Sequence, residues 1–464
     1  MKSKLLLILV SVFFLSTSVF AQFPSVYKAR LDFVFDSVCN AHNIKGAAAN
    51  VLIPNVGVWN GVHGISEVGV PITKSMLFPI GSNTKTYTAV MILKLQELGL
   101  LSINDTIGTW FPGNPNIPGK ITIKQLLRHQ SGLYDYFNSN PATFDSLNAD
   151  FTRTWQPTEM FQFIKAPIAN PGGAFNYCNT NYLLAGLIIE QVTGLSYHMA
   201  LRNYIFTPFN LQHTITPPFE TTLDTIPNGW TADIMGYQED MQVNYGWSNN
   251  AFLSMASAAG AICATAEDLS WFWDNLMHSQ TILNASSLND MKQFIFSGSG
   301  SSYGLGLFRF TNFYAGKTVY SHGGTCFGYI SENLFEPTTN VSVSVLTNQD
   351  SVSNNAILVS SVRGLFKESL GMLSIPAFVN NYTNDEQLLV YPNPAGDVVN
   401  IEFNENGLHA VSVMDISGAV VFETQASSNY VIVETSKFAN GIYQLLTIDN
   451  SSGRRKTTKL VVAR

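Results

Sequence analysis

Ser82 and Lys85 lie three positions apart at the start of a predicted helix. At this spacing two side chains share one face of a helix, so the lysine amine can approach the serine hydroxyl. A serine held in this way can act as a nucleophile. Desolvation near the positive end of a helix favours the neutral amine, which is the form that accepts a proton. The pair alone leaves open the simpler interpretation that Ser82 caps the helix.

Tyr177 and Asn179 follow a Pro-Gly-Gly turn at 171–173 and precede a predicted apolar helix. A phenol can carry a proton between a nucleophile and a leaving group, and an amide can orient a lysine and a substrate carbonyl. Taken alone, the same pattern is equally typical of a surface tyrosine before a helix cap. The motif therefore gains meaning only together with others.

His322, Gly323 and Gly324 lie in a segment that the sequence predicts as an edge strand. Small residues there would let a substrate backbone lie against the strand by β-addition. The backbone N–H groups of Thr325 and Ser82 would together form an oxyanion hole. A histidine considered alone would be interpreted as a strand-end residue with a local hydrogen-bond partner.

These three motifs occur in the order Ser-x-x-Lys, Tyr-x-Asn and His-x-Gly, each on an element of the expected type. In this they resemble the active-site signature of the serine β-lactamase and penicillin-binding protein superfamily, particularly class C β-lactamases and their carboxypeptidase and esterase relatives. The resemblance covers almost all of residues 25–370. Further matching segments are Leu126–Leu133, Thr265–Leu269, Tyr303–Leu307 and Leu346–Asn348.

The resemblance implies a role for each motif residue. Ser82 would be the acylated nucleophile, and Lys85 would be its activating base or proton partner. Tyr177 would serve general acid–base catalysis, while Asn179 would position the substrate and the lysine. His322 would shape the electrostatics around Tyr177 or meet a polar group of the substrate.

His322 stands where many of these relatives have the lysine of a K-T-G motif. Lysine is cationic near neutral pH and histidine only partly so, which weakens the case for tight recognition of a substrate carboxylate. The sequence therefore favours a secreted D-Ala-D-Ala-type carboxypeptidase, peptidase or esterase. The alternatives are a class C-like β-lactamase, a non-hydrolytic penicillin-recognising sensor and a surface binding protein. A Ser-His-Asp hydrolase is disfavoured, because the G-x-S-x-G match at 300–304 leads into a strand.

Other polar residues near the motifs receive structural interpretations. His129 and Ser131 are expected to make hydrogen bonds that support the site. The cysteines could pair in three ways or remain buried thiols, and a disulfide between Cys178 and Cys326 is one hypothesis. No spacing typical of zinc ligands occurs, so we assign no metal and no cofactor. The cysteines are Cys39, Cys178, Cys263 and Cys326.

The elements expected around the motifs define an α+β fold. Strands first, helices in the middle and strands last predict an antiparallel sheet built from both ends of the segment, with a helical region inserted. The expected helices are 27–42, 82–98, 123–129, 158–165, 181–193, 196–205, 265–277 and 353–370. The expected strands are 47–53, 56–61, 304–310, 318–321, 328–336 and 341–347.

The first residues of the chain are expected to form a secretory signal peptide. A basic start is followed by an apolar run that is too short to span a membrane, and small residues predict cleavage after Ala21. No later segment is predicted to span a membrane. The expected organisation is a signal peptide over 1–21, a hydrolase domain over 22–370, a polar linker over 371–389 and a small β-sandwich over 390–464.

Four different motifs follow one another through the C-terminal segment: Tyr391–Asp397, Asp415–Gly418, Gly441–Tyr443 and Lys459–Leu460. In this the segment resembles the type A sorting domain of the type IX secretion system of Bacteroidetes, with a generic immunoglobulin-like module as the alternative. The resemblance implies that residues 390–464 engage the type IX secretion machinery. The protein would then be secreted or held at the cell surface after passing through the periplasm, with this domain removed or replaced by an anchor.

The composition excludes other classes. Of 464 residues, 12% are charged, and the net charge is −7 at pH 7. No basic field is therefore available to hold nucleic acid or an anionic membrane surface. The expected partners are the secretion machinery and a small-molecule or peptide substrate, namely a D-amino-acid peptide, an ester or a β-lactam.

Overall fold

The computed structural model describes residues 23, 25–231, 239–350, 354–374, 389–403, 407–415, 420–449 and 455–464. The chain divides into two compact units, Met1–Pro376 and Ala377–Arg464. The predicted signal peptide lies outside the described residues, as do positions 375–388 of the predicted linker. Within the described ranges, every helix is too short or too polar to cross a lipid bilayer.

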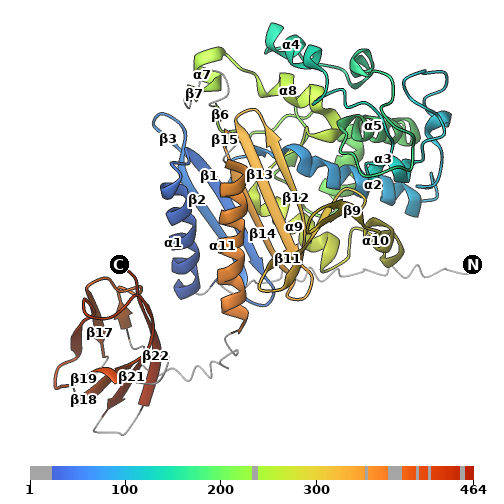
Figure 1. The fold of residues 1–464 in the computed structure, drawn as a ribbon. Coiled ribbons are helices and arrows are strands. Elements are labelled where there is room, and N and C mark those ends of the chain that lie inside the picture. The colour runs from blue at the N-terminus through green and yellow to red at the C-terminus, as the bar shows by residue number, and fades with distance from the viewer. Residues whose placement is uncertain are drawn as a thin grey trace, which may run out of the picture. The chain divides into compact units, whose positions relative to one another are not determined.

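A nine-stranded antiparallel sheet forms the centre of the first unit (Figure 1). The first strands of the unit pair with its last ones, because β1 lies between β2 and β14. The expected α+β architecture, with a sheet built from both ends of the segment, is confirmed. In spatial order the strands are β3 (Val70–Pro71), β2 (Gly57–Glu67), β1 (Gly46–Ile53), β14 (Val341–Thr347), β13 (Tyr329–Glu336), β12 (Lys317–Cys326), β11 (Phe308–Tyr314), β10 (Ser301–Tyr303) and β9 (Ile295–Gly298).

Helices and short turns make up the rest of this unit. The α-helices are α1 (Ser25–Ala41), α2 (Thr84–Glu97), α3 (Ile123–Leu127), α4 (Pro141–Ala149), α5 (Asn179–Thr193), α6 (Tyr197–Leu201), α7 (Met241–Tyr245), α8 (Asn249–Ala256), α9 (Ala266–Met277), α10 (Ala285–Met291) and α11 (Asn354–Ser374). The tighter or wider helical turns are η1 (Gly81–Asn83), η2 (Ile107–Thr109), η3 (Pro157–Phe163), η4 (Arg202–Phe206) and η5 (Ser257–Ala259). Two small sheets contain β4 (Phe78–Pro79), β8 (Cys263–Ala264) and β5 (Thr214–Ile215), and β15 (Gln349–Asp350), β6 (Trp230–Thr231) and β7 (Glu239–Asp240).

The two faces of the large sheet are covered by different elements. Helices α1 and α11 lie side by side along one face, as Figure 1 shows. Leu31 and Phe366, from these helices, pack there with Val343 of β14. The opposite face carries α9 and the helical region, and Ala48 of β1 belongs to that second core. Because both faces are covered, β1 is buried along its whole length.

Several predicted elements differ from the structure. The predicted strand 304–310 is right for 308–310, the start of β11, and wrong for 304–307, because Gly306 takes a φ of 79° and the chain turns between β10 and β11. The predicted helix 123–129 ends earlier, since His129 has a φ of 56°. The predicted helix 158–165 is the 3-10 helix η3. Short helices α4, α7, α8 and α10 were not predicted.

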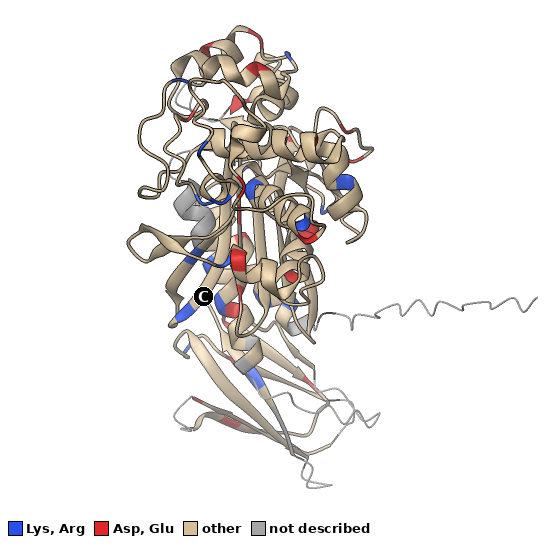
Figure 2. Ribbon diagram, turned by 90° about the vertical axis from the view of Figure 1, so that its right-hand side faces the viewer, with Lys and Arg blue, Asp and Glu red and all other residues tan. Residues whose placement is uncertain are grey.

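Charged side chains are spread thinly over the first unit, and Figure 2 shows basic and acidic positions interspersed along its ribbon. Some pairs join distant segments. Arg30 Nε lies 2.7 Å from Glu368 and connects α1 to α11, while Arg202 Nε lies 2.6 Å from Glu220. Pairs near the surface contribute little to stability, so these contacts mainly fix local geometry.

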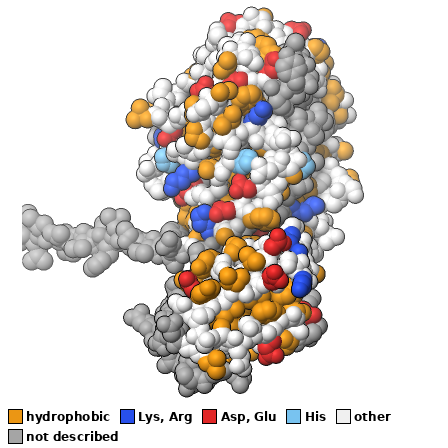
Figure 3. Space-filling view, turned by 90° about the vertical axis from the view of Figure 1, so that its left-hand side faces the viewer, with side chains coloured by type: hydrophobic (Ala, Val, Ile, Leu, Met, Phe, Trp, Pro, Cys, Tyr) orange, Lys and Arg blue, Asp and Glu red, His pale blue; other side chains and the backbone are white. Residues whose placement is uncertain are grey.

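The second unit is a small β-sandwich, as predicted. Its inward side chains alternate with exposed ones: in β20, Val431 and Val433 are buried, and Tyr430, Ile432 and Glu434 are exposed. Figure 3 shows hydrophobic side chains gathered on the surface of this unit. One sheet contains β16 (Leu389–Tyr391), β17 (Val398–Glu402) and β20 (Tyr430–Glu434), and the other β19 (Val420–Ala426), β18 (His409–Met414), β21 (Gly441–Asp449) and β22 (Arg455–Val462).

Candidate active site

Ser82 lies in the tight turn η1, immediately before α2. Gly81 permits the turn, because its φ of 50° is one that other residues rarely adopt. Two hydrogen bonds tie the turn to β13: Asn83 Nδ2 donates to Ser331 Oγ over 2.8 Å, and that hydroxyl donates to the Ile80 carbonyl over 2.7 Å. The Ser82 side chain is therefore held on rigid elements while it remains partly exposed.

Lys85 is fully buried beneath Ser82. Its Nζ lies 2.9 Å from Ser82 Oγ, 2.8 Å from Asn179 Oδ1 and 2.7 Å from the Ala259 carbonyl oxygen. Burial lowers the pKa of Lys85 to about 7, and the nearby Asp135 carboxylate opposes that effect. A neutral amine has two N–H bonds and one lone pair. The two carbonyl oxygens can accept both N–H groups, which leaves the lone pair for the Ser82 hydroxyl.

Asn179 connects the lysine to a second polar group. While its Oδ1 accepts from Lys85, its Nδ2 donates to Asp135 Oδ2 over 3.0 Å. These contacts fix the orientation of the amide, because the oxygen must face the amine and the nitrogen the carboxylate. Asn179 is the first residue of α5, so the start of that helix is fixed to the lysine.

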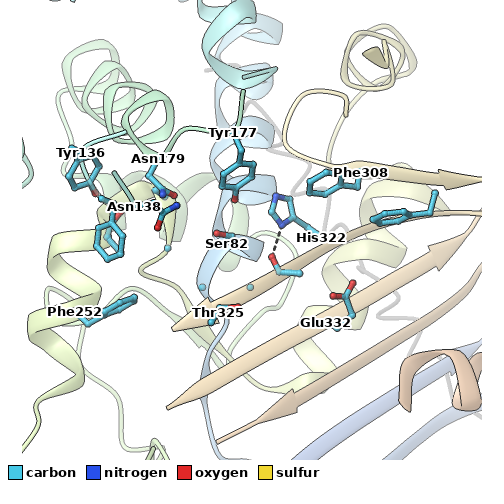
Figure 4. Close-up of a pocket in the computed structure, with 18 residues that line it drawn as sticks. Ser82, Tyr136, Asn138, Tyr177, Asn179, Phe252, Phe308, His322, Thr325 and Glu332 are labelled. Carbon is cyan, nitrogen blue, oxygen red and sulfur yellow. Dashed lines mark hydrogen bonds between the residues drawn. The ribbon is translucent and has the colours of Figure 1, made fainter. Parts of the chain in front are cut away.

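Tyr177 reaches Ser82 from the other side. In Figure 4 its phenol points toward Ser82, and its ring centre lies 4.9 Å from Lys85 Nζ. Burial raises the pKa of Tyr177 well above its ordinary value, so the phenol is protonated at neutral pH. The Ser82 hydroxyl thus lies between an amine that can accept a proton and a phenol that can donate one.

His129 and Ser131 support this arrangement, as predicted. The backbone N–H of Cys178 donates to His129 Nδ1 over 3.1 Å, and the imidazole packs 4.3 Å from the Tyr177 ring, centre to centre. Ser131 Oγ donates to Asn181 Oδ1 over 2.6 Å. Burial lowers the pKa of His129 well below its ordinary value, so this imidazole is neutral. His129 thus holds the backbone beside Tyr177, and Ser131 holds the Asn181 side chain in the first turn of α5.

His322 is buried and uncharged. Its Nδ1 lies 2.7 Å from the Gly323 carbonyl oxygen, which can only accept, so this nitrogen carries the hydrogen. Nε2 is then the acceptor for the Tyr303 hydroxyl, 3.1 Å away. Burial lowers the pKa of His322 to about 3, and Lys85 acts in the same direction. This position therefore lacks the positive charge that a lysine would bring.

The strand that contains His322 is an edge over only half of its length. Its first half, 317–321, pairs with β11, and Tyr320 and Ser321 pair with β13 on the other side as well. The second half, 322–326, pairs with β13 alone. Residues 317–321 are not at an edge, because β9, β10 and β11 extend the sheet beyond them. The predicted edge strand is therefore confirmed for 322–326, the five residues beside Ser82.

The two backbone amides predicted to form an oxyanion hole belong to two segments, η1 and β12, that lie in close contact. A Cβ atom placed on Gly324 would lie 2.8 Å from the Ser82 nitrogen and 2.0 Å from the Ile80 oxygen. One placed on Gly81 would lie 2.9 Å from the Thr325 nitrogen. Gly81 in the turn and Gly324 in the strand are thus both required for the two segments to approach each other this closely.

These elements enclose a cavity of about 440 Å³ with Ser82 on its wall (Figure 4). In Figure 4, Tyr177 and His322 approach Ser82 from one side, and Asn179 and Phe252 lie on the other. The predicted residues that line the cavity are Ser82, Tyr177, Asn179, His322, Gly323, Gly324 and Thr325. Lining residues that were not predicted include Tyr136, Phe137, Asn138, Phe252, Phe308, Phe310 and Glu332.

All four cysteines are buried free thiols, which corrects the hypothesis of a disulfide between Cys178 and Cys326. Cys178 Sγ instead donates to the Leu133 carbonyl oxygen over 3.5 Å. Burial raises the pKa of both thiols, which keeps them protonated and unreactive. The alternative of buried thiols is the correct one.

Comparison with known proteins assigns both units. The family model described as "Beta-lactamase" matches residues 25–358, and the one described as "Secretion system C-terminal sorting domain" matches residues 389–463. The chain therefore belongs to the beta-lactamase family and carries a C-terminal sorting domain. It is a serine hydrolase of the β-lactamase and penicillin-binding protein type, and its sorting domain indicates export to the cell surface or beyond.

Individual relatives agree with this assignment. Penicillin-binding protein 4 of Amycolatopsis lactamdurans is 26% identical over 360 residues, which cover 73% of this chain and 88% of the relative. Penicillin-binding protein 4* of Bacillus subtilis is 29% identical over 195 residues, which cover 40% of this chain and 41% of the relative. A crystal structure of a D-stereospecific amidohydrolase from Streptomyces sp. is 27% identical, with a TM-score of 0.62, and the match covers 74% of this chain and 98% of that one.

Proposed function

We propose that the protein is a secreted hydrolase that forms an acyl-enzyme on Ser82 and acts on amides or esters. The observation that carries this proposal is the hydrogen bonding of Lys85. Two carbonyl acceptors, from Asn179 and Ala259, engage the amine and leave its lone pair directed at the Ser82 hydroxyl. A buried lysine with three such contacts, and with no carboxylate bonded to it among the described residues, is suited to proton transfer.

In the proposed mechanism, Lys85 takes the proton of Ser82 Oγ as this oxygen attacks the substrate carbonyl carbon. The carbonyl oxygen becomes negatively charged and is stabilised by the backbone N–H groups of Ser82 and Thr325. Tyr177 donates its proton to the leaving atom as the tetrahedral intermediate collapses, and the proton held by Lys85 restores the phenol. Water then attacks the acyl ester, and the same groups return the serine.

Asn179 and the backbone of Gly323 and Gly324 would position the substrate. Asn179 would orient the lysine and contact the substrate carbonyl, and the half of β12 without a second partner would offer its backbone to an extended substrate. His322 would hold Tyr303 and border the leaving group. Metals and cofactors have no part in the steps we propose.

The substrate class follows from the uncharged His322. A cation at this position would bind the carboxylate of a β-lactam or of a terminal D-alanine, whereas this imidazole is neutral. We therefore favour an amidase, peptidase or esterase over a β-lactamase. A solved relative named as a D-stereospecific amidohydrolase supports the choice of an amide of a D-amino acid.

Targeting completes the proposal. A signal peptide over 1–21 would direct the chain to the periplasm, and the type IX machinery would recognise 390–464. The hydrolase domain over 22–370 would then act outside the cell or at its surface.

Covalent labelling tests the nucleophile. The wild-type protein should react with a fluorophosphonate probe and hydrolyse nitrophenyl acetate faster than nitrocefin. Ser82→Ala should lose labelling and turnover, while Ser75→Ala, at an exposed serine outside the cavity, should retain both. Unchanged labelling of the Ser82→Ala variant would exclude this nucleophile. Labelling of the wild type without any turnover would favour the alternative of a non-hydrolytic penicillin-recognising sensor.

A further inference from the structure

Glu332 carries the only carboxylate among the described residues that line the cavity, and this lining contains no lysine or arginine. The carboxylate therefore sets the charge of the site on the side where many relatives have a cation. The Glu332 carboxylate takes no part in the proton transfer proposed above, and no structural role explains its place in the cavity wall.

The position of Glu332 follows from the register of the sheet. Glu332 of β13 pairs directly with Gly323 of β12. Paired residues point to the same face, and the missing side chain of Gly323 leaves the space that the carboxylate occupies. A Cβ atom on Gly323 would lie only 2.5 Å from Glu332 Oε2. The carboxylate thus reaches the cavity past a residue of the substrate-binding strand.

The hydrogen bonds of this carboxylate are incomplete. Within the described part of the chain, the Ser321 hydroxyl is its one donor, 2.7 Å from Oε1, and that hydroxyl also lies 2.6 Å from the Asn333 carbonyl oxygen. A single hydrogen cannot fully satisfy both acceptors. Burial accordingly raises the pKa of Glu332 to about 7. A partly buried carboxylate with no cationic partner among the described residues gains most from a ligand that brings one.

Aromatic rings border the same part of the cavity. Phe308 and Phe310 line it, and the Phe308 ring lies 5.4 Å from that of His322. Figure 4 shows Glu332, Phe308 and His322 together on the side of Ser82 opposite Asn179 and Phe252. The faces of aromatic rings attract cations, so a carboxylate beside phenylalanine rings is a favourable setting for an ammonium group.

We propose that Glu332 is a specificity-determining residue that binds a positively charged group of the substrate, an ammonium or a guanidinium. This inference rests on the proposed function of Ser82 and narrows it to cationic amides or esters. The same carboxylate would repel a substrate that carries a negative charge at this end.

Two matched pairs of substrates test the proposal with the full-length protein. The first pair is a D-phenylalanine ester with a free amine and its N-acetylated form. The second is acetylthiocholine and its uncharged 3,3-dimethylbutyl analogue. Together they place the cation on either side of the scissile bond. In at least one pair, the wild-type kcat/KM should be about 10- to 100-fold higher for the cationic member. Glu332→Gln should remove that preference and leave the neutral member within about twofold.

A matched control is Glu267→Gln, because the Glu267 carboxylate bonds to Asn60 and does not line this cavity. This variant should keep the preference. If the wild type hydrolysed the cationic and the neutral member at equal rates in both pairs, the proposed role of Glu332 would be overturned. The proposed serine hydrolase activity would still be supported. A preference that survives in Glu332→Gln, or an equal loss for both members, would also overturn the role of Glu332. Failure to hydrolyse any member would overturn the proposed function and this inference with it.

Discussion

The two faces of the large sheet bury different kinds of side chain. On the face covered by α1 and α11, residues such as Leu31, Val343 and Phe366 form an apolar core. On the opposite face, the helical region buries Lys85 and His129 near the cavity. An apolar core gains stability from each buried group, whereas a buried amine loses solvation that its neighbours only partly restore. Both faces therefore carry an apolar core that stabilises the sheet, and the helical side also holds groups suited to proton transfer.

The largest expected effect comes from Lys85→Met, which sharpens this comparison. Methionine fills the space of the lysine stem without a charge or a polar atom to desolvate. We expect kcat/KM to fall by roughly 10²- to 10⁴-fold, because the proton acceptor is lost. The free energy of unfolding should stay the same or rise by about 1 kcal/mol, because a buried amine is removed. Ester turnover and urea unfolding measure the two quantities.

If Lys85→Met lost both activity and several kcal/mol of stability, the amine would be part of the structural framework, and the division between the two faces would not hold. Lys94→Met provides the comparison. Lys94 is in the same helix but partly exposed, with its Nζ bonded to the Ile282 carbonyl oxygen. This variant should retain activity.

The next largest effect is expected on the other face. Phe366→Ala removes a ring that is fully buried between α11 and the sheet. The free energy of unfolding should fall by about 3–5 kcal/mol. For the molecules that remain folded, kcat/KM should not change, because this core lies across the sheet from Ser82. Leu373→Ala, at an exposed position of the same helix, should cost far less. A changed kcat/KM in folded Phe366→Ala would show that the two faces are coupled.

A smaller effect is expected from pH. The pKa of Lys85 is lowered to about 7, so the amine is charged below this pH and neutral above it. If the neutral form is the base, kcat/KM for a neutral ester should rise about tenfold between pH 6 and pH 8 and then level off. His322, with a pKa of about 3, stays neutral throughout this range, and the phenol of Tyr177 stays protonated.

Glu332 also has a pKa of about 7, so the pH profile of Glu332→Gln is the control. The same rise in this variant would assign the titration to Lys85. A flat profile in the variant would assign it to the carboxylate instead and remove the support for a lysine base.

Much of the site was predictable because its motifs lie on local elements. The spacing of Ser82 and Lys85 is a property of one helical turn, and it places the two groups within 2.9 Å of each other. The order of strands and helices was enough for the α+β fold. These features depend on residues close in sequence or on a pattern that extends over whole elements.

What the sequence did not predict depends on the register between strands and on where the chain turns. Glu332 becomes a cavity residue only because it pairs with Gly323, and a glutamate on a strand carries no local sign of that register. Phe252 and Phe308 look like core residues, because aromatic side chains in a folded chain usually are. The strand predicted at 304–310 is wrong before residue 308 because Gly306 turns the chain, and a lone glycine in an apolar run is a weak signal.

The four buried thiols have a practical consequence for handling this protein. Because the fold contains no covalent cross-link, its maturation does not depend on an oxidising compartment or on a disulfide isomerase. The chain can be produced in the reducing cytoplasm of an ordinary expression host and kept in thiol reductant throughout purification. Alkylating probes would then serve as reporters of unfolding, since each sulfur is exposed only when the chain opens.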